Sequence, residues 1–245
     1  YIFQMISVRT KLYFSMENLI LQQFFVFTFS ERHDKMCSYL YFSFLRGQTM
    51  DSNFFALISR MRYIARWGLM RNALPENIQE HSHMVAVLAH ALGVIRRDIF
   101  HQPCDVNALA TAALYHDASE ILTGDLPTPI KYHNAEIMSA YHAVEDLAVQ
   151  KLLGMLPPEL RETYADVLAE DKDGDIYPLV KAADKLSAYI KCIEERKAGN
   201  NEFLSAEAQT RAALEASPLP EVQYFLEHFI PAFERDLDEL GTIGQ

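Results

Sequence analysis

Four side chains that can bind a metal ion lie in three separate segments of the chain: His81, the adjacent pair His116-Asp117, and Asp184. Imidazole nitrogens and carboxylate oxygens together suit Mn, Co, Fe, Zn or Mg. A His-Asp dipeptide alone is usually a surface pair, but Asp184 lies inside the apolar run 179–186. A carboxylate buried there is costly unless it is paired or bound to a cation. We therefore expect the four side chains to share one divalent cation.

A further carboxylate, Glu120, follows His116 by four residues and Asp117 by three. These spacings place side chains on one face of a helix, so Glu120 is predicted to lie beside the ligands. There it could act as a general acid or base on the water or the leaving oxygen. The alternative is that it only orients His116 or a metal-bound water.

The segments that must position these side chains have a helical pattern. From residue 51 onward apolar residues recur at helical spacing, and the chain contains no alternation typical of strands, no internal repeat and no low-complexity linker. The sequence therefore predicts a single all-α helical bundle over residues 50–245. The expected helices are 54–64, 80–95, 106–122, 134–153, 158–168, 177–198, 206–215 and 222–240.

Residues 1–49 differ from the rest because they are crowded with Phe and Tyr. The apolar stretch 19–29 is interrupted by Gln22-Gln23 and is too short for a bilayer, which takes about 20 apolar residues. We interpret residues 1–49 as an atypical extension, with the domain starting at Met50. The alternative is a helical hairpin that packs on the domain.

Charge and cysteine content exclude several classes of partner. The formal net charge is −11, whereas a protein that follows a nucleic-acid backbone needs a basic surface. The three cysteines, Cys37, Cys104 and Cys192, form no CxxC pair, so neither a disulfide framework nor a zinc ribbon is expected. Reduced thiols fit a cytoplasmic protein best, and we expect neither a nucleic-acid polymer nor a membrane as partner.

The order H…HD…D resembles the HD-domain metal-dependent phosphohydrolases, which are all-helical. The flanking residues resemble the bacterial HD-domain 5′-deoxynucleotidases more closely, from about Met50 towards the C-terminus. The segments that carry this resemblance are 115–129, Arg66-Trp67, Met70-Arg71-Asn72, Glu80-His81-Ser82, Lys191-Cys192 and 198–203. It implies a homodimer that removes phosphate from deoxyribonucleoside 5′-monophosphates with a divalent ion such as Co²⁺ or Mn²⁺.

The same resemblance implies roles for residues near the metal ligands. Arg66 would hold the phosphate, since a guanidinium suits that geometry, and Trp67 would leave no room for a 2′-hydroxyl. Asp125 would accept a sugar hydroxyl or position the attacking water. We expect catalysis from Glu120, Arg66 and Asp125, and substrate contacts from Arg66, Trp67, His81, Asp117, Asp125, Leu126, Pro127, Thr128 and Asp184. Without the resemblance, Arg66-Trp67 would be a solvated Arg beside a core-capping Trp.

The segment after Gly124 contains two prolines. Pro127 and Pro129 are predicted to keep the segment after Gly124 out of helix. Without the resemblance, residues 125–128 would be interpreted only as a turn that ends a helix.

Two other functions remain open at this stage. One is an HD enzyme that acts on deoxynucleoside triphosphates, alarmones or cyclic dinucleotides. The other is a non-catalytic helical domain that binds nucleotides, although retention of all four ligand candidates and Glu120 argues against it. A panel of nucleotide substrates distinguishes the three.

Overall fold

The computed structural model describes residues 52–131, 133–169 and 174–241, except for the side chains of Thr128 and Pro129. Within these ranges the chain is helical, and its only β pairing is an isolated bridge between Ala65 and Asn77. The predicted all-α class is therefore confirmed. The predicted extension 1–49 lies outside the described residues. In the described ranges, no helix is both long and apolar enough to span a membrane.

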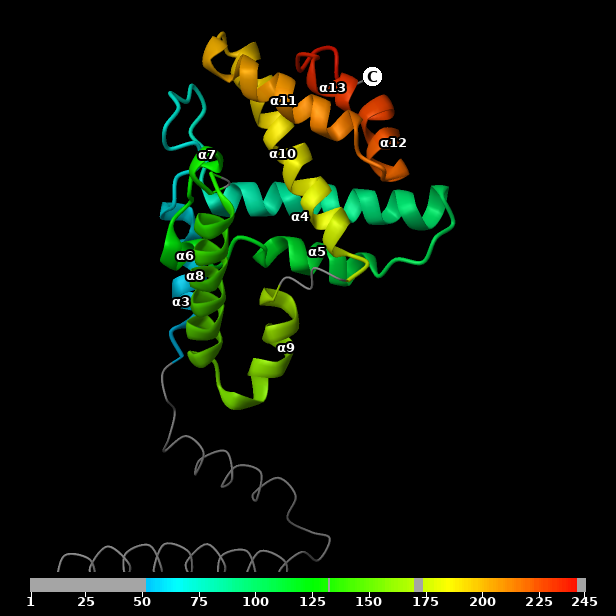
Figure 1. Ribbon diagram of the computed structural model, residues 1–245. Coiled ribbons are helices and arrows are strands. Elements are labelled where there is room, and N and C mark those ends of the chain that lie inside the picture. Colours follow the sequence, from blue (N-terminus) through cyan, green and yellow to red (C-terminus); the bar gives the residue numbers. More distant parts are fainter. Residues whose placement is uncertain (1–51, 132, 170–173, 242–245) are drawn as a thin grey trace, which may run out of the picture. The chain divides into compact units, whose positions relative to one another are not determined.

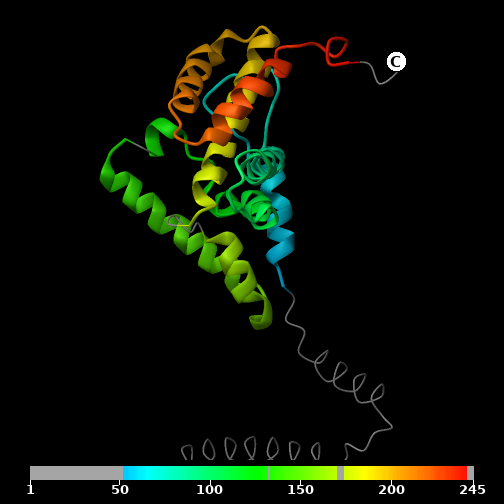
Figure 2. The ribbon, with the colours of Figure 1, turned by 90° about the vertical axis from the view of Figure 1, so that its right-hand side faces the viewer.

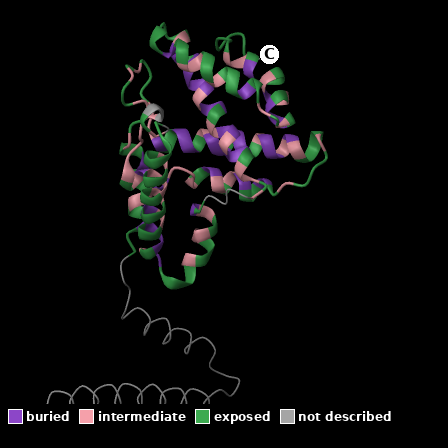
Figure 3. Ribbon diagram, in the orientation of Figure 1, coloured by how far each residue is buried: buried purple, intermediate pink, exposed green. Residues whose placement is uncertain are grey.

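The main core forms where three helices meet: α4 (Ile78–Val94), α5 (Val106–Tyr115) and α10 (Tyr177–Lys197). Helix α4 packs along α5 on one side and is crossed by α10 on another (Figure 1). Buried residues concentrate on these helices (Figure 3). Helix α4 begins at Ile78 because Asn77 and Glu80 form a reciprocal capping box at its first turn.

A second, smaller core joins α3 (Phe54–Ile58), α8 (Ala135–Gly154) and α9 (Pro158–Leu168). Figure 2 shows α8 in green and α9 in yellow-green along one diagonal. Phe54, Leu152 and Ala118 are fully or almost fully buried in this cluster. Ala118 directly follows His116-Asp117, so the second core holds the turn that carries that dipeptide.

The remaining helices cover the rest of α10 and connect the two cores. Helices α11 (Leu204–Glu215) and α13 (Ile230–Phe233) pack on α10, and α12 (Pro220–His228) packs between α11 and α4. Short turns of helix link these elements: η2 (Ser59–Tyr63), the π-type η3 (Ile95–Ile99), α6 (Glu120–Thr123), α7 (Thr128–Lys131) and η4 (Asn201–Phe203).

The predicted single helix 106–122 is wrong, because α5 ends at Tyr115 and α6 begins at Glu120. His116 explains the break. Its Nδ1 lies 2.8 Å from the carbonyl oxygen of Ala113, the acceptor that the Asp117 N–H would use in a continued helix. The next amide, that of Ala118, bonds to Tyr115 only three residues back. His116-Asp117 therefore occupies a turn between two helices.

Three smaller expectations also differ from the structure. The predicted helix 222–240 breaks at Phe229, because Pro231 lacks an N–H and clashes with the preceding turn. The predicted helix 54–64 changes from α3 to the 3₁₀ helix η2. Pro129 lies inside α7 and not in an open loop, which is allowed because proline is tolerated in the first turn of a helix.

Candidate functional site

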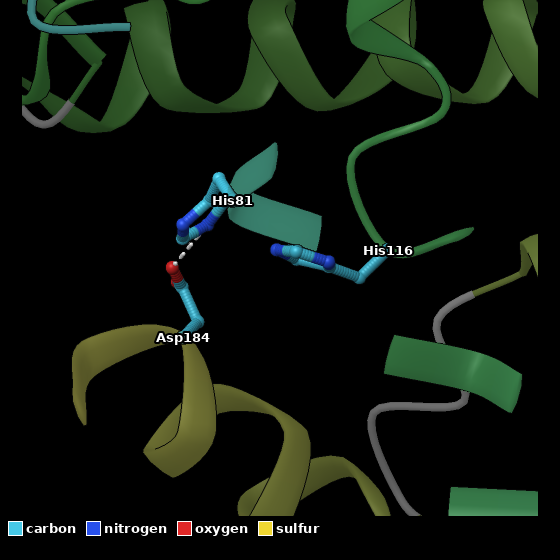
Figure 4. A group of neighbouring side chains, drawn as sticks. All are labelled: His81, His116 and Asp184. Atoms are coloured by element: carbon cyan, nitrogen blue, oxygen red, sulfur yellow. Dashed lines mark ion pairs between the residues drawn. The ribbon is translucent and has the colours of Figure 1, made fainter. Parts of the chain in front are cut away.

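Three of the four predicted metal ligands meet between α4, α10 and the turn after α5. His81, His116 and Asp184 each place one ligand atom within 4.8 Å of the others (Figure 4). His81 Nε2 lies 3.0 Å from Asp184 Oδ1, the contact drawn as a dashed line in Figure 4. The two imidazole rings are tilted by 56° with their centroids 5.3 Å apart.

The two histidines are oriented by protein oxygens at their other ring nitrogen. His116 Nδ1 donates to the Ala113 carbonyl, which can only accept, so Nε2 of the neutral ring carries the lone pair. His81 Nδ1 lies 3.2 Å from Ser187 Oγ. Both Nε2 atoms are buried and have no hydrogen-bond partner among the described residues. Each Nε2 instead faces a carboxylate oxygen, of Asp184 at 3.0 Å for His81 and of Asp117 at 3.2 Å for His116. Such an arrangement, with Nδ1 held and Nε2 directed at carboxylates, suits a pair of metal ligands.

Asp117 lies at the edge of this group. Its Oδ2 is 3.2 Å from His116 Nε2, 3.6 Å from His81 Nε2 and 3.4 Å from Arg66 Nη1. Burial opposes ionisation of Asp117, but His116, His81 and Arg66 outweigh it and hold the pKa below its usual range. Burial is likewise outweighed at Asp184, where His81 lowers the pKa. The site therefore presents two ionised carboxylates beside two imidazoles.

Glu120 begins α6 immediately after the turn that carries the ligands. Its predicted place on one continuous helix with His116 and Asp117 is wrong, because the turn separates them. It nevertheless remains close enough to Asp117 for their charges to repel. Glu120 is only 6% exposed, and its Oε2 has no hydrogen-bond partner in the described part of the chain. Burial, reinforced by Asp117 and Asp125, raises its pKa to about 9.

Arg66 and Trp67 are joined by a carboxylate that sequence analysis did not single out. Arg66 Nε and Trp67 Nε1 both donate to Glu76 Oε2, each at 3.1 Å. The Trp67 indole packs edge-on against Phe203, with ring centroids 5.2 Å apart. Trp67 also has a φ of +57°, a conformation that costs energy in a residue with a side chain.

The segment after α6 brings one more predicted residue to the site. Burial raises the pKa of Asp125, while the charge of Arg66 and a backbone hydrogen bond from Trp67 oppose that rise. Asp125 therefore lies near both. Leu126 and Pro127 follow it, partly exposed, between α6 and α7. The side chain of Thr128 lies outside the described residues.

Comparison with known proteins gives a consistent result. A family model described as 5′-deoxynucleotidase YfbR-like matches residues 53–233. Proteins named 5′-deoxynucleotidase YfbR from Shigella boydii and Escherichia coli are each 50% identical over 192 residues, which is 78% of this chain and 96% of theirs.

Solved structures agree with the helical architecture. The chain is similar to a Listeria innocua HD-domain phosphohydrolase, with a TM-score of 0.66 and 26% identity over 74% of this chain and 88% of that one. A Pyrococcus horikoshii protein, 21% identical with a TM-score of 0.57, covers 75% of this chain and 98% of its own, and shares the fold.

Proposed function

Because the chain belongs to the YfbR-like 5′-deoxynucleotidase family, we propose that it hydrolyses deoxyribonucleoside 5′-monophosphates at the site around His81, His116 and Asp184. The products are the deoxynucleoside and phosphate. The observation that carries the proposal is the convergence of two buried imidazole Nε2 atoms with the carboxylates of Asp184 and Asp117, beside an arginine. Phosphate monoesters react extremely slowly in water, so the enzyme supplies a very large acceleration.

The side chains predicted for the cation, His81, His116, Asp117 and Asp184, would hold it. Two imidazole nitrogens and two ionised carboxylates form a donor set that suits Co²⁺ or Mn²⁺, which we propose as the ions. A divalent ion lowers the pKa of a coordinated water and neutralises charge on a phosphoryl oxygen.

Arg66 binds and orients the phosphate. Its Nε is engaged by Glu76 and its Nη1 faces Asp117, so the guanidinium is fixed before the substrate arrives. A preorganised cation is effective because it stabilises the developing charge without having to move. Planar donor geometry also matches phosphate oxygens better than a lysine would.

Glu120 transfers a proton, and Asp125 accepts a hydrogen bond, on opposite sides of the phosphoryl group. The raised pKa of Glu120, about 9, keeps a proton on its carboxyl at neutral pH. Glu120 gives that proton to the 5′-oxygen as the bond to phosphorus breaks. Asp125 accepts a hydrogen bond from the attacking water or from a sugar hydroxyl.

Trp67 sets the preference for deoxyribose by occupying the space that a 2′-hydroxyl needs. Leu126, Pro127 and Thr128 contact the nucleotide from the segment that follows Asp125. A clash or an unpaired group at a single hydroxyl can produce large discrimination between substrates.

Three wider features belong to the same proposal. The catalytic domain spans residues 50–245, and the enzyme works as a homodimer, as its family resemblance implies. The free thiols of Cys104 and Cys192 fit a reducing compartment such as the cytoplasm. Sedimentation as a monomer at working concentrations would remove the homodimer from the proposal.

Phosphate release from paired substrates tests the reaction itself. The purified chain is treated with a chelator, dialysed, and assayed with dAMP, AMP, dATP and an alarmone in the presence of different divalent ions. We expect no release without metal, recovery with Co²⁺ or Mn²⁺, and faster release from dAMP than from AMP. Faster release from dATP or the alarmone would assign a different substrate. Metal binding without release from any deoxynucleoside monophosphate would indicate a binding domain.

A further inference from the structure

The segment that carries Arg66 and Trp67 is fastened to α10 by a buried charged cluster that takes no part in the proposed chemistry. We call residues 66–76 the Trp67 loop. Glu195 on α10 is completely buried, and Lys191, one turn earlier, is 4% exposed. The amides of Ala73 and Leu74 donate to the two Glu195 carboxylate oxygens at 2.8 and 3.0 Å.

Side chains of the same cluster also donate hydrogen bonds to carbonyl oxygens of the loop. Lys191 donates from Nζ to Glu195 Oε1 and to the Leu74 carbonyl. Asn200 donates from Nδ2 to Glu195 Oε2 at 2.7 Å and to the Arg71 carbonyl at 2.6 Å. Backbone donors or acceptors of the loop are thus bound at Arg71, Ala73 and Leu74, which restrains its path strongly.

A second set of contacts connects the fastened backbone to the two substrate side chains. Glu76 lies two residues after Leu74, and its Oε2 accepts from both Trp67 Nε1 and Arg66 Nε. The Arg66 amide also donates to the Glu76 carbonyl at 3.0 Å. Beneath the indole, the Phe203 ring lies 5.6 Å from Lys191 Nζ. The cluster therefore supports Trp67 from two directions.

This arrangement differs from an ordinary stabilising ion pair. Trp67 has a positive φ, and a strained backbone persists only where its surroundings hold it. By contrast, the buried Glu221 pairs with Arg96 at 2.5 Å between Oε1 and Nε, and Arg96 also reaches the Asp175 carbonyl. That pair contacts no part of the Trp67 loop, so it serves as a matched reference.

We propose that Glu195, together with Lys191 and Asn200, positions Trp67 and Arg66 through the backbone at 71–74 and through Glu76, and thereby sets the discrimination between deoxyribose and ribose. Glu195 and Glu76 are positioning residues and do not touch the substrate. The inference rests on the proposed role of Trp67 as the sugar-sensing side chain.

The test uses the fluorescence of Trp67, the only tryptophan in the chain. Glu195→Gln and Glu76→Gln are compared with Glu221→Gln, which alters a buried carboxylate away from the loop. For the first two variants we expect stronger acrylamide quenching and a red-shifted emission. The ratio of kcat/KM for dAMP to that for AMP should fall about tenfold. Affinity for Co²⁺ alone, followed by absorbance, should stay unchanged, because none of the metal ligands lies in the Trp67 loop and Asp184 lies eleven residues before Glu195 on α10.

The outcomes separate this inference from the proposed function. Equal sugar discrimination and equal quenching in Glu195→Gln, Glu76→Gln and Glu221→Gln would overturn it. Trp67→Ala serves as the reference for sugar sensing. Lost discrimination in Trp67→Ala with normal discrimination in both loop variants rejects the positioning role alone. Normal discrimination in Trp67→Ala rejects the sugar-sensing role itself. If Glu195→Gln does not fold, Glu76→Gln decides, because the Glu76 side chain is 15% exposed and tolerates substitution better.

Discussion

Two buried polar clusters in the described part of the chain are built partly on α10, and they differ in how well their atoms are paired. In the metal-binding cluster, three buried atoms have no hydrogen-bond partner among the described residues: His81 Nε2, His116 Nε2 and Glu120 Oε2. In the cluster around Glu195, each carboxylate oxygen accepts two hydrogen bonds, one from a loop amide and one from a side chain.

This difference separates residues that meet a ligand from residues that hold them in place. A buried polar atom without a partner costs free energy, so several gathered at one point indicate that something external completes them. Isolated cases such as Ser82 Oγ also occur in the described part of the chain. The informative feature is therefore that two of the atoms belong to His81 and His116, whose ligand atoms lie within 4.8 Å of each other and of one from Asp184. A fully paired cluster rigidifies its surroundings and needs no ligand.

The largest expected effect tests the unpaired cluster. Glu120→Gln keeps the shape of the side chain but removes the acid, so turnover of dAMP should fall about 10²–10⁴-fold, the usual contribution of general acid–base catalysis. Substrate binding and the thermal midpoint should change little, because the Glu120 carboxyl makes no bond through Oε2. Steady-state kinetics and a melting curve measure both. Near-normal turnover would remove Glu120 from the mechanism.

An intermediate effect is expected from acid on the paired cluster. Hydrogen bonds from Lys191 and from the Leu74, Asn200 and Ala73 donors outweigh burial and lower the pKa of Glu195 from 4.5 to about 2. A depressed pKa means that the folded state prefers the ionised form. The resulting stabilisation is present above about pH 4.5 and is lost as the pH falls towards 2.

Glu195→Gln removes this titration, so the comparison is between two pH profiles. The thermal midpoint of the unaltered protein should drop more steeply between pH 4.5 and 3 than that of Glu195→Gln, by a margin on the order of 5 °C. Trp67 emission should report the loss of the loop contacts over the same interval. Parallel profiles would show that Glu195 does not stabilise the fold through its charge.

The smallest effect is expected at the surface of the same loop. Arg71 pairs with Glu202 at 2.9 Å, but its side chain is 92% exposed. Exposed ion pairs contribute little, so Arg71→Ala should leave the thermal midpoint almost unchanged. It should leave Trp67 emission unchanged, because the Arg71 carbonyl that Asn200 binds is retained. A large shift in either measurement would mean that loop positioning does not depend chiefly on the buried cluster.

Much of the fold could be predicted because apolar spacing is a local property. Helices α4, α8, α9, α10 and α11 lie close to their predicted ranges. Two of the failures have causes that apolar periodicity does not show: a side chain binds a backbone acceptor, or a proline removes a backbone donor. At His116 the imidazole occupies the Ala113 carbonyl, and near Phe229 the following proline ends the helix.

Part of the candidate site could also be predicted, because residue type and order can be read from the sequence. The ligand residues are recognisable by type and order, and His81, His116 and Asp184 do converge. Glu76 and Ser187 were not foreseen, because their contacts depend on tertiary packing. The sequence does carry an indication of the Glu195 cluster: Lys191 and Glu195 lie four residues apart in α10, next to Ile190 and Ile193, a spacing that predicts an ion pair.

Helix α10 supplies both Asp184 and Glu195, and this has a consequence for the order in which the protein is made. Chains emerge from the ribosome N-terminus first, at about 5–20 residues per second. The Trp67 loop and His81 therefore appear more than a hundred residues before the carboxylates that complete them. A nascent chain lacking α10 has neither a finished metal site nor an anchored loop, so we expect this hydrolase to become active only after α10 has been synthesised and has packed on α4.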